Sequence, residues 1–120
     1  MQQAKAKAIA VLQIGYYPAL LQMRQSMLEH EGYAVTSALG NDQGMAVATT
    51  AHFDVIVVGF CSDTQNRIQM VRWLKQNVPS SPIVALLANN LESLPEADCE
   101  TLSWNPSVWL TAVRTCTKPS

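Results

Sequence analysis

Short apolar runs alternate with helical patterns along almost the whole of this 120-residue chain. The expected strands are the runs 8–14, 33–38, 53–60 and 83–88, with a fifth strand near Asn105. The expected helices are 17–32, 41–50, 65–77 and 107–117. Such alternation is typical of βα units that build a parallel sheet, and 53–60 has the apolar, β-branched composition of a strand covered on both faces. We therefore expect an α/β fold in which residues 1–120 form a single domain.

Several helix ends and helix faces are visible in the sequence. Gly32 is placed to stop the first helix, and Asn41 or Asp42 to cap the second. The apolar residues expected to face the sheet are Leu20, Leu21, Met23, Met27 and Leu28 in the first helix, Ile68, Val71, Trp73, Leu74 and Val78 in the third, and Val108, Trp109, Leu110, Ala112 and Val113 in the last. The segment 89–100 contains Pro95 and only a turn or so of plausible helix. A fourth helix there is expected to be short, distorted or missing.

Charge and cysteine content narrow the classes of function. The net charge is −1 and only 14% of the residues are charged, which leaves no basic footprint for nucleic acid or acidic lipid. The apolar runs fall well short of the ~20 residues of a membrane span, and the first residues lack the pattern of a secretory signal. Cys61, Cys99 and Cys116 are widely spaced and have no metal-binding histidine partner. We expect a cytoplasmic protein with reduced thiols, no cofactor and no nucleic-acid or membrane partner.

Five strings in the sequence resemble the receiver domain of response regulators, and together they span nearly the whole chain. They are 11–20, 31–35, 53–58, 81–88 and the pair Asn105-Pro106. In that family they correspond to the first strand with its loop, the entry to the second strand, the strand before the phosphoacceptor, the fourth strand and a lysine-proline pair. The resemblance implies a flavodoxin-like three-layer sandwich, with a five-stranded parallel sheet of order 2-1-3-4-5 and helices on both faces.

The same resemblance locates the family's phosphorylation site, and its chemical groups are missing from this sequence. The magnesium-binding acids fall on Gly15 and Tyr16, the acceptor aspartate on Gly59, the switch hydroxyl on Leu87 and the lysine on Asn105. Receiver chemistry needs a carboxylate that attacks a phosphoryl group, further acids that hold magnesium and a lysine that neutralises charge. The resemblance therefore implies a degenerate pseudo-receiver, of the CheY-like kind in fold but without the phosphorylation site.

Two neighbouring residues are candidates to replace the missing groups. Asp63 is either a displaced phosphoacceptor or the cap of the third helix, and capping is the favoured interpretation. Cys61 is either an oxidisable thiol or a small buried apolar residue, and the second is favoured because no base or cation adjoins it in the sequence.

Aromatic residues gather near the vacated positions. Tyr16, Tyr17, Phe60 and Trp104 are expected near the carboxyl edge of the sheet, and Trp109 lies on the last helix. They either pack against one another or form an exposed aromatic surface of the kind that binds proteins. For Trp109 both a core role and an interface role are open. A trimmed fourth helix would expose additional apolar area for a second chain to cover.

These observations favour an atypical receiver-like protein that acts in two-component signal transduction by binding another protein without being phosphorylated. The expected partner is a histidine kinase, a regulator, an output protein or a second copy of the chain. A second hypothesis is a small-molecule sensor that uses the pocket at the carboxyl edge of the sheet. A third is residual phosphoacceptor or thiol activity through Asp63 or Cys61. No cluster of acid, base and nucleophile is visible, so we do not expect an enzyme.

Overall fold

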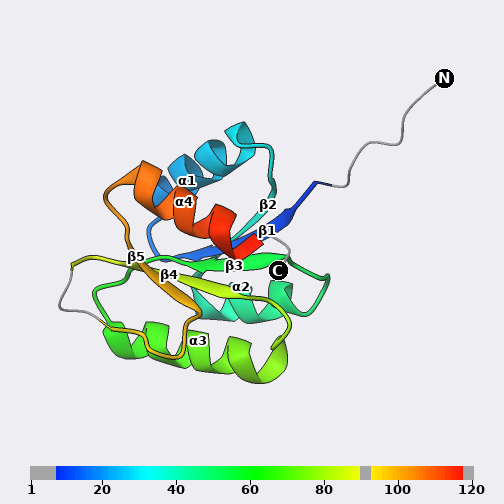
Figure 1. Cartoon of the computed structure of the whole chain (residues 1–120). Helices are drawn as coiled ribbons and strands as arrows, with labels where there is room; N and C mark the ends of the chain where they lie inside the picture. Colours follow the sequence, from blue (N-terminus) through cyan, green and yellow to red (C-terminus); the bar gives the residue numbers. More distant parts are fainter. Residues whose placement is uncertain (1–7, 90–92, 118–120) are drawn as a thin grey trace.

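The computed structural model describes residues 8–89 and 93–117, which build a five-stranded parallel sheet between two layers of helices (Figure 1). The strands are β1 (Ala10–Gly15), β2 (Ala34–Leu39), β3 (Val55–Val58), β4 (Ile83–Leu87) and β5 (Cys99–Leu102). The helices are α1 (Pro18–His30), α2 (Gly40–Ala48), α3 (Thr64–Asn77) and α4 (Pro106–Thr117). The strand order is β2-β1-β3-β4-β5, so the expected fold class is confirmed.

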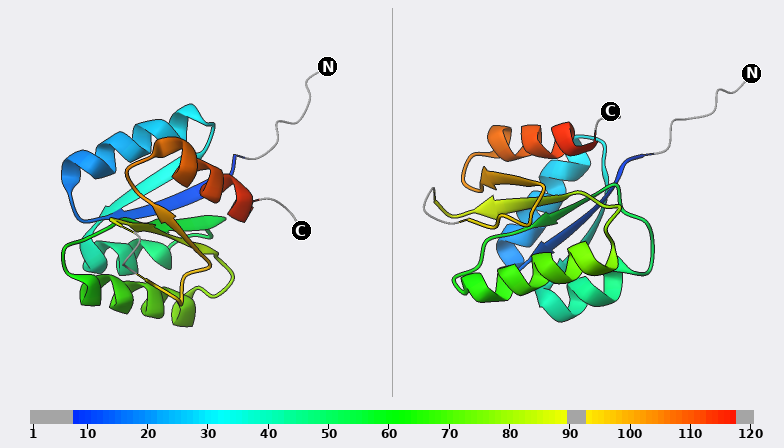
Figure 2. Two further views of the ribbon diagram at one scale, coloured as in Figure 1. Left: turned by 60° about the vertical axis from the view of Figure 1, so that its left-hand side comes forward. Right: turned by 60° about the horizontal axis from the view of Figure 1, so that its bottom comes forward.

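Two helices cover each face of the sheet. Figures 1 and 2 show α1 and α4 on one face and α2 and α3 on the other. All residues of β3 and β4 are buried, whereas the edge strands β2 and β5 alternate between exposed and covered residues. Burial on both faces explains why the two central strands appear in the sequence as continuous apolar runs. None of the helices in the described ranges combines the length and the apolarity that a bilayer span requires.

The sheet separates two apolar cores. On one face Leu12 and Ile56 pack with Met70 of α3. On the other face Val57 packs with Trp109 of α4. Because successive side chains of a strand point to opposite faces, one central strand feeds both cores. The structure thus places Trp109, which is 1% exposed, in the core, one of the two roles left open by the sequence.

The buried helix faces differ from the expected ones. Met23 and Val108 were expected to face the sheet, but their side chains are 44% and 45% exposed. Arg24 and Arg67 take buried positions instead. Arg24 lies three residues after the buried Leu21, so it shares the stripe of α1 that faces the sheet, and Met23 falls beside that stripe.

The predicted cap of α2 is wrong. The residue at the N-cap is Leu39, and no side chain caps the helix. The chain passes directly from β2 into α2 through Gly40, whose φ of +81° is readily adopted only by glycine. Asn41 makes its contacts elsewhere, whereas Gly32, with φ of +96°, follows the last turn of α1 as expected.

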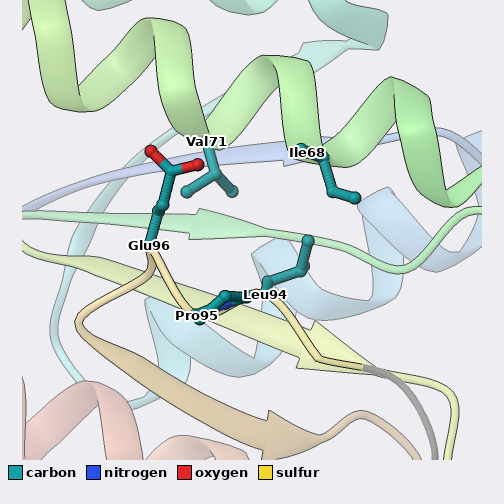
Figure 3. Close-up of a pocket in the computed structure, with 5 residues that line it drawn as sticks. All are labelled: Ile68, Val71, Leu94, Pro95 and Glu96. Atoms are coloured by element: carbon teal, nitrogen blue, oxygen red, sulfur yellow. The ribbon is translucent and has the colours of Figure 1, made fainter.

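The connection between β4 and β5 has no helix in its described part. Residues 93–98 run beside α3, and Figure 3 shows Leu94 facing Ile68 and Val71 across a small cavity. Leu94 is 2% exposed and packs with Ala85 and Leu87. The cavity measures about 10 Å³, room for about one water molecule. In its described part the loop therefore packs Leu94 against β4 and α3, and residues 90–92 of the weak segment lie outside the described residues.

Candidate functional site

The carboxyl ends of the central strands meet at one edge of the sheet, where open α/β sheets bind ligands. Gly15 ends β1 and Leu87 ends β4, while Gly59 directly follows β3. The N–H of Gly59 donates to the carbonyl oxygen of Ile14 at 2.8 Å, which extends the pairing of β1 and β3 to the residue after the strand. The structure therefore brings together three of the positions that the sequence assigned to this edge.

The guanidinium group of Arg24 occupies the space beside Gly59. A Cβ atom at Gly59 would lie 2.8 Å from Nη1 of Arg24, closer than real contacts of this kind, so a side chain at position 59 requires Arg24 to move. Arg24 is only 4% exposed, and its Nε has no hydrogen-bond partner among the described residues. Burial lowers the pKa of this guanidinium below its ordinary value. A cation thus lies beside Gly59, the position at which the sequence predicts that the acceptor carboxylate is missing.

A second buried arginine reaches the same edge from α3. Nη1 of Arg67 donates to the carbonyl oxygens of Gly59 and Leu86, at 3.3 Å and 2.5 Å. These carbonyls lie at the ends of β3 and β4, where the ladder no longer satisfies every acceptor. Arg67 therefore links α3 to both central strands at their carboxyl ends.

Tyr16 belongs to a polar network on the α2 and α3 side of the edge. Its Oη donates to Oδ1 of Asn41 at 2.7 Å, and Nδ2 of Asn41 donates to the backbone and side-chain oxygens of Asn66, both at 2.9 Å. Asp63 adds to the network, because its Oδ1 accepts from the N–H of Asn66 at 3.3 Å. Burial, and next the nearby thiol of Cys61, raise the pKa of Tyr16 well above its ordinary value. Tyr16 is half-buried. Its hydrogen bonds hold it on the α2 and α3 side, apart from the other aromatic residues of the edge.

The other candidate positions have roles in local structure. Asp63 is the N-cap of α3, the role favoured from the sequence. Leu87 is 6% exposed and belongs to a small apolar cluster. Oδ1 of Asn105 accepts from the N–H and from Oγ of Ser107, at 3.2 Å and 3.0 Å, at the start of α4. Cys61 is half-buried and is not in a disulfide.

The donors at this edge do not fit a divalent cation. Within 8–89 and 93–117, no three residues among His, Cys, Asp and Glu are grouped closely enough to hold a metal ion. Gly15 and Tyr16 provide no carboxylate, and magnesium prefers oxygen ligands that carry charge. The guanidinium beside Gly59 would in addition repel a positive ion.

A groove with mostly apolar walls opens on the α1 side of the edge. Its volume is about 430 Å³, and its walls come from α1, α4 and the residues after β3, β4 and β5. Phe60 lies in the wall, with its ring centre 5.5 Å from that of Tyr17 and 5.9 Å from the guanidinium carbon of Arg24. Trp104, which is 67% exposed, and Trp109 also line the groove. Except for Tyr16, the aromatic residues expected at this edge therefore gather in or beside one groove.

Solved structures of response regulators share this architecture, although no protein-family model and no curated protein sequence matches the chain. Chemotaxis response regulator CheY4 of Vibrio cholerae aligns with a TM-score of 0.80 and 20% identity, over 92% of this chain and 99% of that one. The chain has the receiver fold. Response regulator TrrA of Thermotoga maritima, in complex with Mg²⁺ and BeF, aligns with a TM-score of 0.80 and 14% identity, over 90% of this chain and 98% of that one. A structure of histidine kinase ThkA in complex with TrrA also aligns, with a TM-score of 0.80 and 14% identity, over 92% and 99% of the two chains.

Sequence reasoning missed the two arginines that fill the edge of this receiver fold. A signal was present, because Arg24 lies between Leu21 and Leu28 at helical spacing, and Arg67 lies four residues before Val71. A charged residue on the stripe that faces a sheet needs a partner or a function. The contacts of Asn41 had no comparable signal, because they depend on how α2 and α3 pack together.

Proposed function

We propose that this chain is a receiver-like protein of two-component signal transduction that works by binding another protein and is not phosphorylated. One observation above all supports the proposal that the chain is not phosphorylated. The guanidinium of Arg24 takes the space that a side chain at Gly59 would need. Attack on a phosphoryl group would require a carboxylate and bound magnesium at that place. The described residues there provide neither that carboxylate nor a cluster of acidic ligands for magnesium.

We further propose that the chain is not an enzyme. The carboxylate of Asp63 caps the N-terminus of α3. Nε2 of His52 lies 3.6 Å from Oδ1 of Asp54, at the other end of β3 from Cys61. A thiol becomes a strong nucleophile beside a base, and this histidine lies too far from Cys61 to act as one. If the Cys61→Ser and Asp63→Asn variants reproduce every phenotype of the native chain, the third hypothesis loses both of its candidates.

The proposed contact surface lies at the carboxyl edge and on the adjoining helices. Five large apolar side chains are exposed there by more than a third, namely Tyr17, Met23, Leu39, Trp104 and Val108. Exposed aromatic residues of this kind are enriched in protein interfaces. The complex of TrrA with a histidine kinase supports a kinase as the kind of partner. A regulator, an output protein and a second copy of this chain are the alternatives.

The absence of phosphorylation is tested by an amide NMR titration with magnesium and beryllofluoride. We expect no saturable shifts over residues 59–64, because beryllofluoride binds as a phosphoryl mimic only where a carboxylate and magnesium receive it. TrrA is the positive control, since its structure contains Mg²⁺ and BeF. Saturable shifts that disappear in Asp63→Asn would contradict the proposal and assign phosphoryl binding to Asp63.

Partner binding is tested by cross-linking in the source cells and by titration of the purified candidate into the labelled chain. We expect Trp104→Ala to weaken binding by about tenfold or more, as for an exposed aromatic hot spot. Trp73, a half-buried tryptophan of α3 on the opposite face of the sheet, provides a control of the same residue type as Trp73→Ala. Circular dichroism checks that both variants are folded. Equal binding by the two folded variants would contradict the proposed surface.

A second candidate function is small-molecule sensing. The groove of about 430 Å³ beside Arg24 is the observation that favours it. Binding there and binding to a protein are compatible, because a ligand that prefers one conformation of the groove would change the affinity of a partner at its rim.

A further inference from the structure

The groove on the α1 side combines apolar walls with one buried cation. We propose that it binds a small organic monoanion, a carboxylate attached to an aromatic or short acyl body, with the carboxylate on Arg24. This inference deepens the second candidate function and rests on it. It does not depend on whether the chain docks to a protein or is phosphorylated.

Arg24 supplies the first argument, because it is buried and has no acidic partner among the residues that the structure describes. The ion pairs of the described residues involve other groups, and no hydrogen bond satisfies Nε of Arg24 there. The guanidinium carbon lies 5.9 Å from the ring centre of Phe60, and an aromatic face is a weak partner for a buried charge. Burying a cation is unfavourable unless an acceptor compensates for the lost water. A ligand carboxylate would provide that acceptor, and its two oxygens match the paired N–H groups of a guanidinium.

The walls supply the second argument. The apolar lining includes Leu20, Met27, Phe60, Trp104, Pro106 and Trp109. Methionine and aromatic side chains adapt well to flat or flexible apolar molecules. The volume of about 430 Å³ lies within the roughly 300–1,000 Å³ of small-molecule pockets. An apolar body of one or two rings, or a short acyl chain, therefore suits the groove.

The charge of the groove supplies the third argument. Among its described lining residues, Arg24 is the one charged side chain, and Ser103 is the one with a hydroxyl group. A phosphate monoester carries close to two charges at neutral pH and three acceptor oxygens, which need several donors. A single buried guanidinium in apolar surroundings instead matches a single carboxylate.

The test uses a pair of probes of almost equal shape, 1-naphthylacetate and the uncharged 1-naphthylacetamide. Each is titrated into the purified chain while tryptophan fluorescence is recorded, because Trp104 and Trp109 line the groove. We expect saturable binding of the acid and roughly ten- to a hundredfold weaker binding of the amide, the range of a hydrogen-bonded charge. Equal affinity for both probes, or no binding of the acid at millimolar concentration, would overturn the proposal.

Three variants assign the site. Arg24→Met should weaken binding of the acid by tenfold or more and remove the preference for the acid over the amide. Trp104→Ala should weaken both probes to a similar extent, because it removes wall area and no charge. Arg72→Met is the matched control, since Arg72 is an exposed arginine of α3 that pairs with Glu96, outside the groove. It should leave both affinities unchanged, and an unchanged acid affinity in folded Arg24→Met contradicts the inference.

A measurement on the unaltered chain keeps the inference testable if Arg24→Met does not fold. The acid should shift the amide signals of Gly59 and Phe60, which adjoin the guanidinium, more than those of α2 and α3. Shifts elsewhere with none at these two residues would place the probe outside the groove and refute the assignment. The titration with the acid contains no magnesium or beryllofluoride. Its outcome therefore does not depend on the outcome of the phosphorylation test.

Discussion

Arg24 carries a positive charge into the interior of the protein with little compensation from its neighbours. The side chain is 4% exposed and has an unsatisfied Nε, and burial lowers its pKa. We expect an arginine in these conditions to oppose folding, because the charged form loses hydration that its contacts do not replace. Residues that weaken a fold in this way are common at binding sites, where a ligand supplies the missing interaction.

The first prediction concerns the stability of Arg24→Met. Methionine keeps the apolar length of the side chain and removes the charge, so the free energy of unfolding should rise by about 1–3 kcal/mol. Urea denaturation followed by circular dichroism measures the change. Arg72→Met at an exposed position should alter stability by less than about 0.5 kcal/mol. A loss of more than about 1 kcal/mol in Arg24→Met would mean that the guanidinium makes a net favourable contribution.

The second prediction concerns the thiol of Cys116 on α4. Burial, then the neighbouring Cys99 and Asp98, raise the pKa of Cys116 above its ordinary value. The folded chain therefore keeps this thiol neutral at a pH where the unfolded thiol, with a pKa of about 8.5, already ionises. Consequently the free energy of unfolding should fall as the pH rises above about 8.5.

Alkylation by iodoacetamide measures this shift, because the thiolate is the reactive form. The rate at Cys116 should rise at a higher pH than in a short unstructured peptide of the same local sequence. Cys99→Ser should move the rise back toward the peptide, since the Cys99 thiol contributes to the raised pKa both by charge and by a hydrogen bond. Identical pH profiles for the folded chain and the peptide would contradict the prediction.

At the scale of elements, α3 depends on its cap more clearly than α2. Oδ1 of Asp63 accepts from the third residue of α3, whereas α2 begins without a side-chain cap. Asp63→Ala should therefore lower the free energy of unfolding by about 1 kcal/mol, and Asp63→Asn should largely preserve it. Asp42→Ala in the first turn of α2 is the control, with an expected loss below about 0.5 kcal/mol. Equal losses in both alanine variants would show that capping does not account for the role of Asp63.

The strands could be predicted from the sequence better than the helix faces. The run around Val55–Val58 is buried on both sides, so its apolar composition alone marks it as a central strand. The buried face of α1 was harder to predict, because Met23 is apolar and exposed while Arg24 is charged and buried. Composition ranks these two residues in the opposite order. The spacing of Arg24 from Leu21 and Leu28, and not the composition of the helix, indicates which of them faces inward.

At the scale of the whole molecule, the candidate site is assembled from distant parts of the chain. The sequence shows that Gly59, Leu87 and Asn105 offer no carboxylate, hydroxyl or amine, because these groups are visible in the residue itself. It could not show what fills the space, because Arg24 and Arg67 reach that edge from opposite faces of the sheet. The polar network of Tyr16 and the apolar groove are separated by the same sheet.

A side chain at position 59 and the guanidinium of Arg24 need the same space. The residues at these two distant positions should therefore vary together among related sequences. An acidic side chain can enter position 59 only if the residue at position 24 becomes shorter or swings away. Among related sequences, we expect aspartate at the first position to occur with a small or apolar residue at the second, and arginine at the second to occur with glycine at the first. An alignment with frequent pairs of aspartate and arginine would contradict this. If the coupling holds, Gly59→Asp alone would displace the guanidinium of Arg24, so an acidic side chain at position 59 would also reshape the groove that Arg24 lines.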